Sequence, residues 1–156
     1  MTGRTAAVTI VLAALLTGVS VYYLQLYYFY ETVTADQIDI RLTPVDGGTP
    51  ESLAVADFEG IDATSSPLRF RGCFTTTESP ESLRDRYKVM AEPTPLIGPG
   101  WFDCYDANTV GDDLEAGAAI AFLGEKAIAD GVDRVVAVYP DGRGFVWHQL
   151  NDKYQD

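Results

Sequence analysis

The sequence has few of the residues that bind metals or nucleic acids. Only two cysteines and one histidine occur among its 156 residues, too few for a zinc finger, a four-cysteine iron–sulfur site or a three-histidine metal centre. Bases are also scarce, because 11 Lys+Arg stand against 23 Asp+Glu, a formal charge of -12. Phosphate contacts rely on Lys and Arg, so this balance argues against a nucleic-acid-binding protein. We therefore expect no metal, no other cofactor and no nucleic-acid partner.

Motifs that mark common catalytic sites are also missing. The chain has no Gly-x-Ser-x-Gly nucleophile elbow and neither of the glycine-rich phosphate loops. A Ser/His/Asp triad would have to use His148, the sole histidine. Its place in a strand-like segment, between Trp147 and Gln149, is more typical of a hydrogen-bonded structural histidine than of a general base. We therefore predict that the protein is not an enzyme.

The N-terminal segment has no charge over a long stretch. Residues 5–30 form an uncharged run of 26 that ends in a cluster of tyrosines. As a helix it would be roughly 39 Å long, more than the roughly 30 Å hydrocarbon core of a bilayer. Tyrosines favour the headgroup level. Arg4 precedes the run and Glu31 follows it, so the positive-inside rule puts the N-terminus in the cytoplasm. We predict a bacterial inner-membrane anchor at residues 1–30, with residues 31–156 in the periplasm.

Two further features of this segment bear on its role. Small residues at residues 18–20 are also compatible with a signal peptide cleaved after Ser20. The apolar run continues for ten residues beyond that point, which favours the uncleaved anchor. Spacings of four join small side chains that would let a second helix approach closely in lipid: Thr9, Ala13 and Thr17, and Ala14 and Gly18.

Residues 31–156 are predicted to form one acidic α+β domain. They carry all 23 acids and 10 of the 11 bases, a net charge of -13. Alternating apolar residues and the turn at residues 140–143 indicate a sheet of four to five antiparallel or mixed strands, with about two helices on one face. The segments expected as strands are residues 37–44, 53–58, 68–75, 134–139 and 144–150.

Two helices are expected between these strands. Ser79 precedes Pro80 and Glu81, which is a typical helix start, and the helix should present Leu83, Tyr87 and Met90 on one face. A second helix should begin at Asp112 or Asp113 and run through Leu114, Ala118 and Phe122 to about Gly124. Residues 106–117 resemble a calcium loop, but two ligand positions lack an oxygen side chain, so we expect no calcium there.

The two cysteines are predicted to pair. In an exported domain a disulfide between Cys73 and Cys104 is the default, and it would attach a long loop to the sheet. Two buried free thiols are one alternative. A redox or metal role, such as copper held with Met90 and His148, is another, although no Cys-x-x-Cys spacing supports it.

The loop at residues 91–109 combines three prolines with aromatic side chains. Aromatic residues dominate binding hot spots, so Trp101, Phe102 and Tyr105 are candidate partner-binding residues. The same side chains would serve equally as a hydrophobic plug folded over the sheet, because an ordered long loop must bury something.

Three sequence segments together carry a resemblance. They are SPLRFRGCF at residues 66–74, PLIGPGWFDC at residues 95–104 and VVAVYPDGRG at residues 135–144. With the tyrosine-rich anchor, they resemble a family of small uncharacterised single-pass membrane proteins of alphaproteobacteria. No activity is assigned to that family, so the resemblance implies no site residue.

Three hypotheses for function follow. The first is a non-enzymatic accessory subunit or assembly helper, anchored in the lipid bilayer beside a larger membrane protein complex. The second is a periplasmic ligand-binding or sensing module that uses Arg69, Arg71 and Asp103 in a pocket. The third is an enzyme that uses Cys73 or Cys104 with His148. We favour the first, because the anchor has a possible packing face and no catalytic set is evident.

Overall fold

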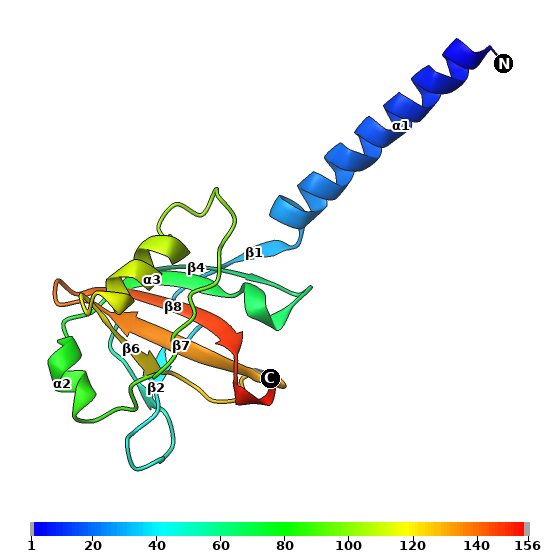
Figure 1. Cartoon of the computed structure of the whole chain (residues 1–156). Coiled ribbons are helices and arrows are strands. Elements are labelled where there is room, and N and C mark those ends of the chain that lie inside the picture. Colours follow the sequence, from blue (N-terminus) through cyan, green and yellow to red (C-terminus); the bar gives the residue numbers. More distant parts are fainter. Residues whose placement is uncertain (1, 155–156) are drawn as a thin grey trace. The chain divides into compact units, whose positions relative to one another are not determined.

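The computed structural model describes residues 2–154, and its contacts divide the chain into two units (Figure 1). The first is Met1–Tyr30 and the second is Glu31–Asp156.

The first unit is a helix without a core of its own. Helix α1 spans Gly3–Tyr23 and continues through a π-helical turn, Leu24–Tyr28. Thr2 begins it as the N-cap, its hydroxyl accepting from the Thr5 backbone N–H. No side chain of α1 is buried. Within the part of the chain that the structure describes, Gly3–Tyr28 is the one helix long and apolar enough to cross a membrane, with a mean hydropathy of 2.0. A signal sequence has the same features.

The second unit is built on an antiparallel six-stranded sheet (Figure 1). The strand order is β1-β4-β5-β8-β7-β6. A second sheet pairs β2 with β3. The bounds are β1 Tyr30–Val33, β2 Arg41–Leu42, β3 Glu51–Ser52, β4 Ala56–Ala63, β5 Arg71–Thr75, β6 Ile120–Leu123, β7 Val132–Val138 and β8 Arg143–Leu150. The α+β class is therefore confirmed, with more strands than the four to five expected.

The centre of the sheet is the predicted hairpin of β7 and β8. All seven residues of β7 are buried. The turn between the strands needs Gly142 at a φ of 89°, a conformation that other residues adopt at a cost. The register pairs Val136 with Val146 and Val135 with Trp147. Because side chains alternate, these two pairs lie on opposite faces of the sheet.

The two faces are covered by different parts of the chain. One face carries the main apolar core, in which residues of β5, β7 and β8 pack with the segment around β2 and with helix α2, Pro80–Arg84. The core residues are Ile40, Leu42, Leu53, Phe70, Phe74, Leu83, Tyr87, Phe122, Val136, Val138 and Val146. On the other face, the disulfide from Cys73 reaches the loop that precedes helix α3, Ala107–Glu115.

The first predicted helix begins as expected but ends early. Ser79 caps α2 by accepting from the Ser82 backbone N–H. The helix stops at Arg84, and Tyr87 and Val89 instead form bridges to Pro44 and Phe122. The predicted helical face of Leu83, Tyr87 and Met90 is therefore wrong. Residues 88–90 hydrogen-bond along β6 instead, which covers an edge that would otherwise present unpaired backbone groups.

The second predicted helix lies earlier in the sequence than expected. Asp106 is its N-cap and accepts from the backbone N–H groups of Asn108 and Thr109, at 2.9 and 3.2 Å. The helix ends before Gly117, whose φ of 73° suits a glycine. Residues 120–123, predicted as helix, form β6 because they pair with β7, with Phe122 opposite Val136.

Three predicted strands are only partly formed. In residues 37–44 the alternation holds, with Ile40 and Leu42 buried, but only β2 joins a ladder and Thr43 turns inward to donate to the Gly124 carbonyl at 2.7 Å. In residues 53–58 the chain leaves β3 and enters β4. In residues 68–75 a 3₁₀ turn, Pro67–Arg69, precedes β5.

Candidate functional site

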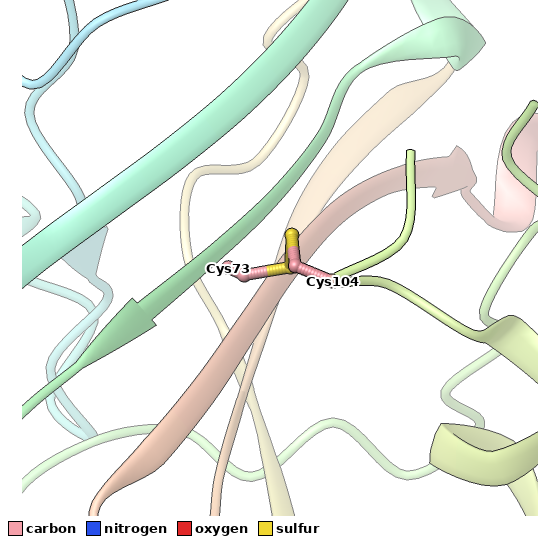
Figure 2. Close-up of a disulfide and its surroundings, with 2 residues drawn as sticks. All are labelled: Cys73 and Cys104. Atoms are coloured by element: carbon pink, nitrogen blue, oxygen red, sulfur yellow. A yellow bond between two sulfur atoms is a disulfide. The ribbon is translucent and has the colours of Figure 1, made fainter. Parts of the chain in front are cut away.

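Cys73 and Cys104 form a disulfide (Figure 2). Cys73 lies in β5, opposite Phe145 of β8. Cys104 lies in the long segment between α2 and α3, and the two Cα atoms are 6.2 Å apart. The predicted disulfide is thus present in the structure, where neither sulfur is a free thiol.

Buried polar side chains of the sheet hold the same loop. Arg71 is buried and donates to the carbonyls of Leu96 at 2.7 Å and Ile97 at 3.3 Å. It also donates to the carbonyls of Leu68 and Phe70. The Gln149 amide accepts from Thr94 N–H at 2.8 Å and donates to the Glu92 carbonyl at 3.0 Å.

The three residues proposed for a ligand-binding pocket lie in different parts of the domain. Arg71 donates to four backbone carbonyls. Asp103 lines a different hollow, beside Phe102 and Tyr105, and Arg69 ends the 3₁₀ turn before β5. Neither Arg69 nor Arg71 is among the described residues that line this hollow with Asp103.

The aromatic residues of the loop divide into two groups. Phe102 and Tyr105 are buried, and the Tyr105 ring packs edge-on against Phe145 at 6.1 Å between centroids. Both are thus buried like the hydrophobic plug of the second interpretation, and their role in binding a partner stays a prediction. Trp101 is 37% exposed and Ile97 is 77% exposed. A partner that binds this loop would meet Trp101 and Ile97.

Tyr105 has a buried hydroxyl with no hydrogen-bond partner among the described residues. Burial raises the pKa of this phenol. Since an unsatisfied buried hydroxyl costs free energy, we expect Tyr105→Phe to raise the free energy of unfolding by about 1 kcal/mol. Thermal or urea unfolding of the purified protein measures the change.

Tyr139→Phe is the matched control. Its ring also packs against Phe145, at 5.5 Å, but its hydroxyl donates to Asp113 at 2.9 Å. We expect this variant to lose about 1 kcal/mol, because it removes a formed hydrogen bond. Equal losses in both variants would contradict the assignment of Tyr105 as unsatisfied.

A charged cluster lies on the face of the sheet that carries the main apolar core. Arg134 of β7 and His148 of β8 are paired in register and both are buried. Arg134 Nε donates to His148 Nε2 at 3.1 Å, and Arg134 Nη1 donates to Glu125 at 2.9 Å. The Arg134 guanidinium also lies 4.9 Å from the centroid of the Phe70 ring.

The protonation state of His148 follows from these contacts. Its Nδ1 lies 2.7 Å from the Pro67 carbonyl, which can only accept, so Nδ1 carries the proton. Nε2 accepts from Arg134 and is therefore unprotonated. Burial lowers the pKa of His148 to about 4, and Arg134 and Arg71 add to this. This neutral, hydrogen-bonded histidine has the structural role expected from the sequence.

Arg134 is a residue that the sequence analysis missed. Its signal in the sequence is a base inside a run of valines that is otherwise buried. Such a residue needs charge partners from elsewhere in the chain, and Glu125 supplies one.

The small residues of α1 are uncovered by the chain. The residues concerned, all exposed, are Thr9, Ala13, Ala14, Thr17 and Gly18. Thr9 donates to the Thr5 carbonyl at 3.0 Å, so its hydroxyl is satisfied within the helix.

The fold and site describe a small α+β domain with a disulfide-held loop, preceded by an apolar helix. The chain belongs to a family of unknown function, DUF6446, whose model matches residues 40–156. The match begins after the apolar helix and covers nearly all of the domain. No curated protein and no solved structure shows detectable similarity to the chain.

Proposed function

We propose that this protein is a non-enzymatic accessory protein of the bacterial inner membrane. In this proposal α1 is an uncleaved anchor with the N-terminus in the cytoplasm, and the domain is periplasmic. Its partners are the lipid bilayer and a larger membrane protein complex, which it serves as an accessory subunit or assembly helper.

The observation that carries the proposal is the apolar helix. Gly3–Tyr28 has a mean hydropathy of 2.0, and its most apolar stretch has no buried residue. Such a surface needs lipid or a partner to cover it. Arg4 and Glu31 flank it in the order that the positive-inside rule associates with a periplasmic C-terminus.

The disulfide supports the same compartment. Disulfides persist in oxidising compartments such as the periplasm and are rare in the bacterial cytoplasm. Cys73 and Cys104 are both committed to this bond, and in the proposal the bond holds the loop that presents Trp101 and Ile97.

Topology is the first expected result. A C-terminal alkaline phosphatase fusion should be active, because this enzyme matures only outside the cytoplasm. A C-terminal green fluorescent protein fusion should be dark, because that protein becomes fluorescent only when it folds in the cytoplasm. Mass spectrometry of the purified protein should find residues before Ser20. A mature chain that begins at residue 21 would rule out the anchor, and so would the reverse fusion pattern.

The accessory role is tested on the helix surface. Changing Ala14 and Gly18 to Leu keeps the segment apolar and insertable but holds a second helix away, since close approach in lipid depends on small side chains. We expect normal membrane insertion and loss of the partner from affinity purifications in mild detergent.

Val19→Leu is the control for this experiment. Val19 lies roughly 100° around the helix from Gly18 and roughly 140° from Ala14, outside both rows of small residues, so added bulk there should leave the partner bound. An unchanged partner yield in the Ala14→Leu, Gly18→Leu variant would exclude this face as the contact. The loop residues Ile97 and Trp101 would be the next surface to change.

A further inference from the structure

A small cavity opens beside the charged cluster of Arg134. Its volume is about 260 Å³, just below the range of roughly 300–1,000 Å³ typical of sites for drug-sized ligands. Segments far apart in the sequence line it, so the cavity exists only in the folded domain. The lining residues that carry its chemistry are Glu31, Gln37, Ile38, Asp62, Phe70 and Arg134.

Arg134 is held rigidly at this cavity. Two of its three guanidinium nitrogens are engaged, Nε with His148 and Nη1 with Glu125. Its third nitrogen, Nη2, has no hydrogen-bond partner among the described residues. The side chain is only 8% exposed and lies over the Phe70 ring, so a ligand would meet a pre-positioned donor.

Asp62 of β4 supplies the opposite charge. It is half-buried, and its carboxylate accepts from the Ala63 backbone N–H at 2.7 Å. Among the described residues it makes no ion pair. Burial raises the pKa of Asp62, while Arg134 and Arg71 partly oppose this effect and Glu31 adds to it. A cation bound here would relieve the cost of a half-buried, unpaired carboxylate.

The charges at the cavity are unequal. Glu125 forms an ion pair with Arg134 at 2.9 Å, whereas Asp62 and Glu31 form no ion pair among the described residues. The cavity therefore favours a ligand with a positive group, and the open Nη2 of Arg134 favours an oxygen acceptor on the same molecule.

We propose that this cavity binds a small zwitterion, with its ammonium group against Asp62 and Glu31 and its oxyanion on Arg134. Glu31 directly follows Tyr30, the last residue of the uncharged run. Because this run is the proposed membrane anchor, the zwitterion has two possible sources. One is the ethanolamine phosphate headgroup of a membrane lipid, and the other is a free amino compound. Binding here is independent of the accessory role proposed for α1.

The test uses O-phosphoethanolamine and the full-length protein in a zwitterion-free, non-ionic detergent. Isothermal titration calorimetry should show binding of this probe, with ethanolamine alone and inorganic phosphate alone each much weaker. Asp62→Asn should weaken binding at least about ten-fold, the size expected for loss of one charge-assisted hydrogen bond. This variant should fold, because it removes a carboxylate whose charge is disfavoured by burial.

Glu59→Gln is the matched control for Asp62→Asn. Glu59 lies in the same strand, is exposed, and stands three residues away, on the opposite face of β4. The Glu59→Gln substitution removes the same charge as Asp62→Asn and should leave binding unchanged. No binding of O-phosphoethanolamine by folded wild-type protein would overturn the proposal, and so would equal affinities in the Asp62→Asn and Glu59→Gln variants.

Nanodiscs distinguish the two sources of the zwitterion. In discs of phosphatidylcholine, whose headgroup lacks N–H donors, added O-phosphoethanolamine should bind. If the lipid headgroup is the ligand, discs of phosphatidylethanolamine should abolish this binding by competition. Equal binding in both discs would identify a free zwitterion as the ligand.

Discussion

Replacing both cysteines with serine should lower the free energy of unfolding of the domain by about 3.7 kcal/mol, the chain-entropy value for closing a loop of 31 residues. The double variant avoids leaving a reactive thiol. Urea unfolding under oxidising conditions measures the difference. Because Arg71 and Gln149 still hold residues 92–97, we expect the domain to fold and the loop near residue 104 to become the first site of proteolysis.

A reductant provides the control for this prediction. Dithiothreitol should destabilise the wild-type protein by a similar amount and leave the Cys73→Ser, Cys104→Ser variant unaffected. If wild-type stability is the same with and without reductant, the bond contributes nothing and the unfolded chain is not constrained by it.

Acidification should destabilise the domain through His148. Burial lowers the pKa of His148 to about 4 from an ordinary value of 6.5. Between these two values the unfolded state binds a proton that the folded state does not, so stability rises with pH and falls on acidification. The contribution is fully present above pH 6.5, and on the order of 3 kcal/mol is lost by pH 4.

His148→Gln isolates this effect. Glutamine offers an uncharged acceptor to Arg134 and does not titrate in this range. The variant keeps the other titratable groups near the cluster, including Asp62. The raised pKa of Asp62 stabilises the folded state at acid pH, opposite to the effect of His148, but equally in both proteins. The wild-type protein should lose more stability than the variant between pH 6.5 and 4. If urea unfolding shows the same loss of stability in both proteins between pH 6.5 and 4, the pKa of His148 is not lowered in the folded state and the prediction is wrong.

Several local features were predictable from the sequence because each depends on neighbouring residues. The uncharged run before Glu31 needs no partner to be recognised as a helix of membrane length. Ser79 before Pro80 indicates a helix start, and Asp141-Gly142 between two runs of apolar residues indicates a hairpin. The structure has all three.

The errors arise where a segment pairs with distant chain. Ala118 and Phe122 continue a helical spacing from Leu114, so the sequence favours a helix through residue 122. The antiparallel partner of Phe122 is Val136 in β7, and this pairing outweighs the local preference. The error at Tyr87 has the same cause, because its bridge to Pro44 replaces the helical turn that would place it beside Leu83.

Cys73 and Cys104 were predictable as a pair because no other cysteine exists, but the burial of Phe102 and Tyr105 was not. The sequence alone could not distinguish a hydrophobic plug from an exposed surface, because both use the same aromatic residues. Docking onto Phe145 decided the question for Tyr105.

The sequence by itself determined an apolar N-terminal helix, a strongly acidic α+β domain, a buried hairpin and one disulfide. These follow from composition, short-range pattern and the count of cysteines. Only the tertiary structure decided the six-strand order, the inward Arg134 with His148 and Glu125, and the cavity that Arg134 shares with Asp62. Arg134 and Asp62 are 72 residues apart. A local sequence pattern does not predict which distant charged residues lie close together, because strand order and register decide this.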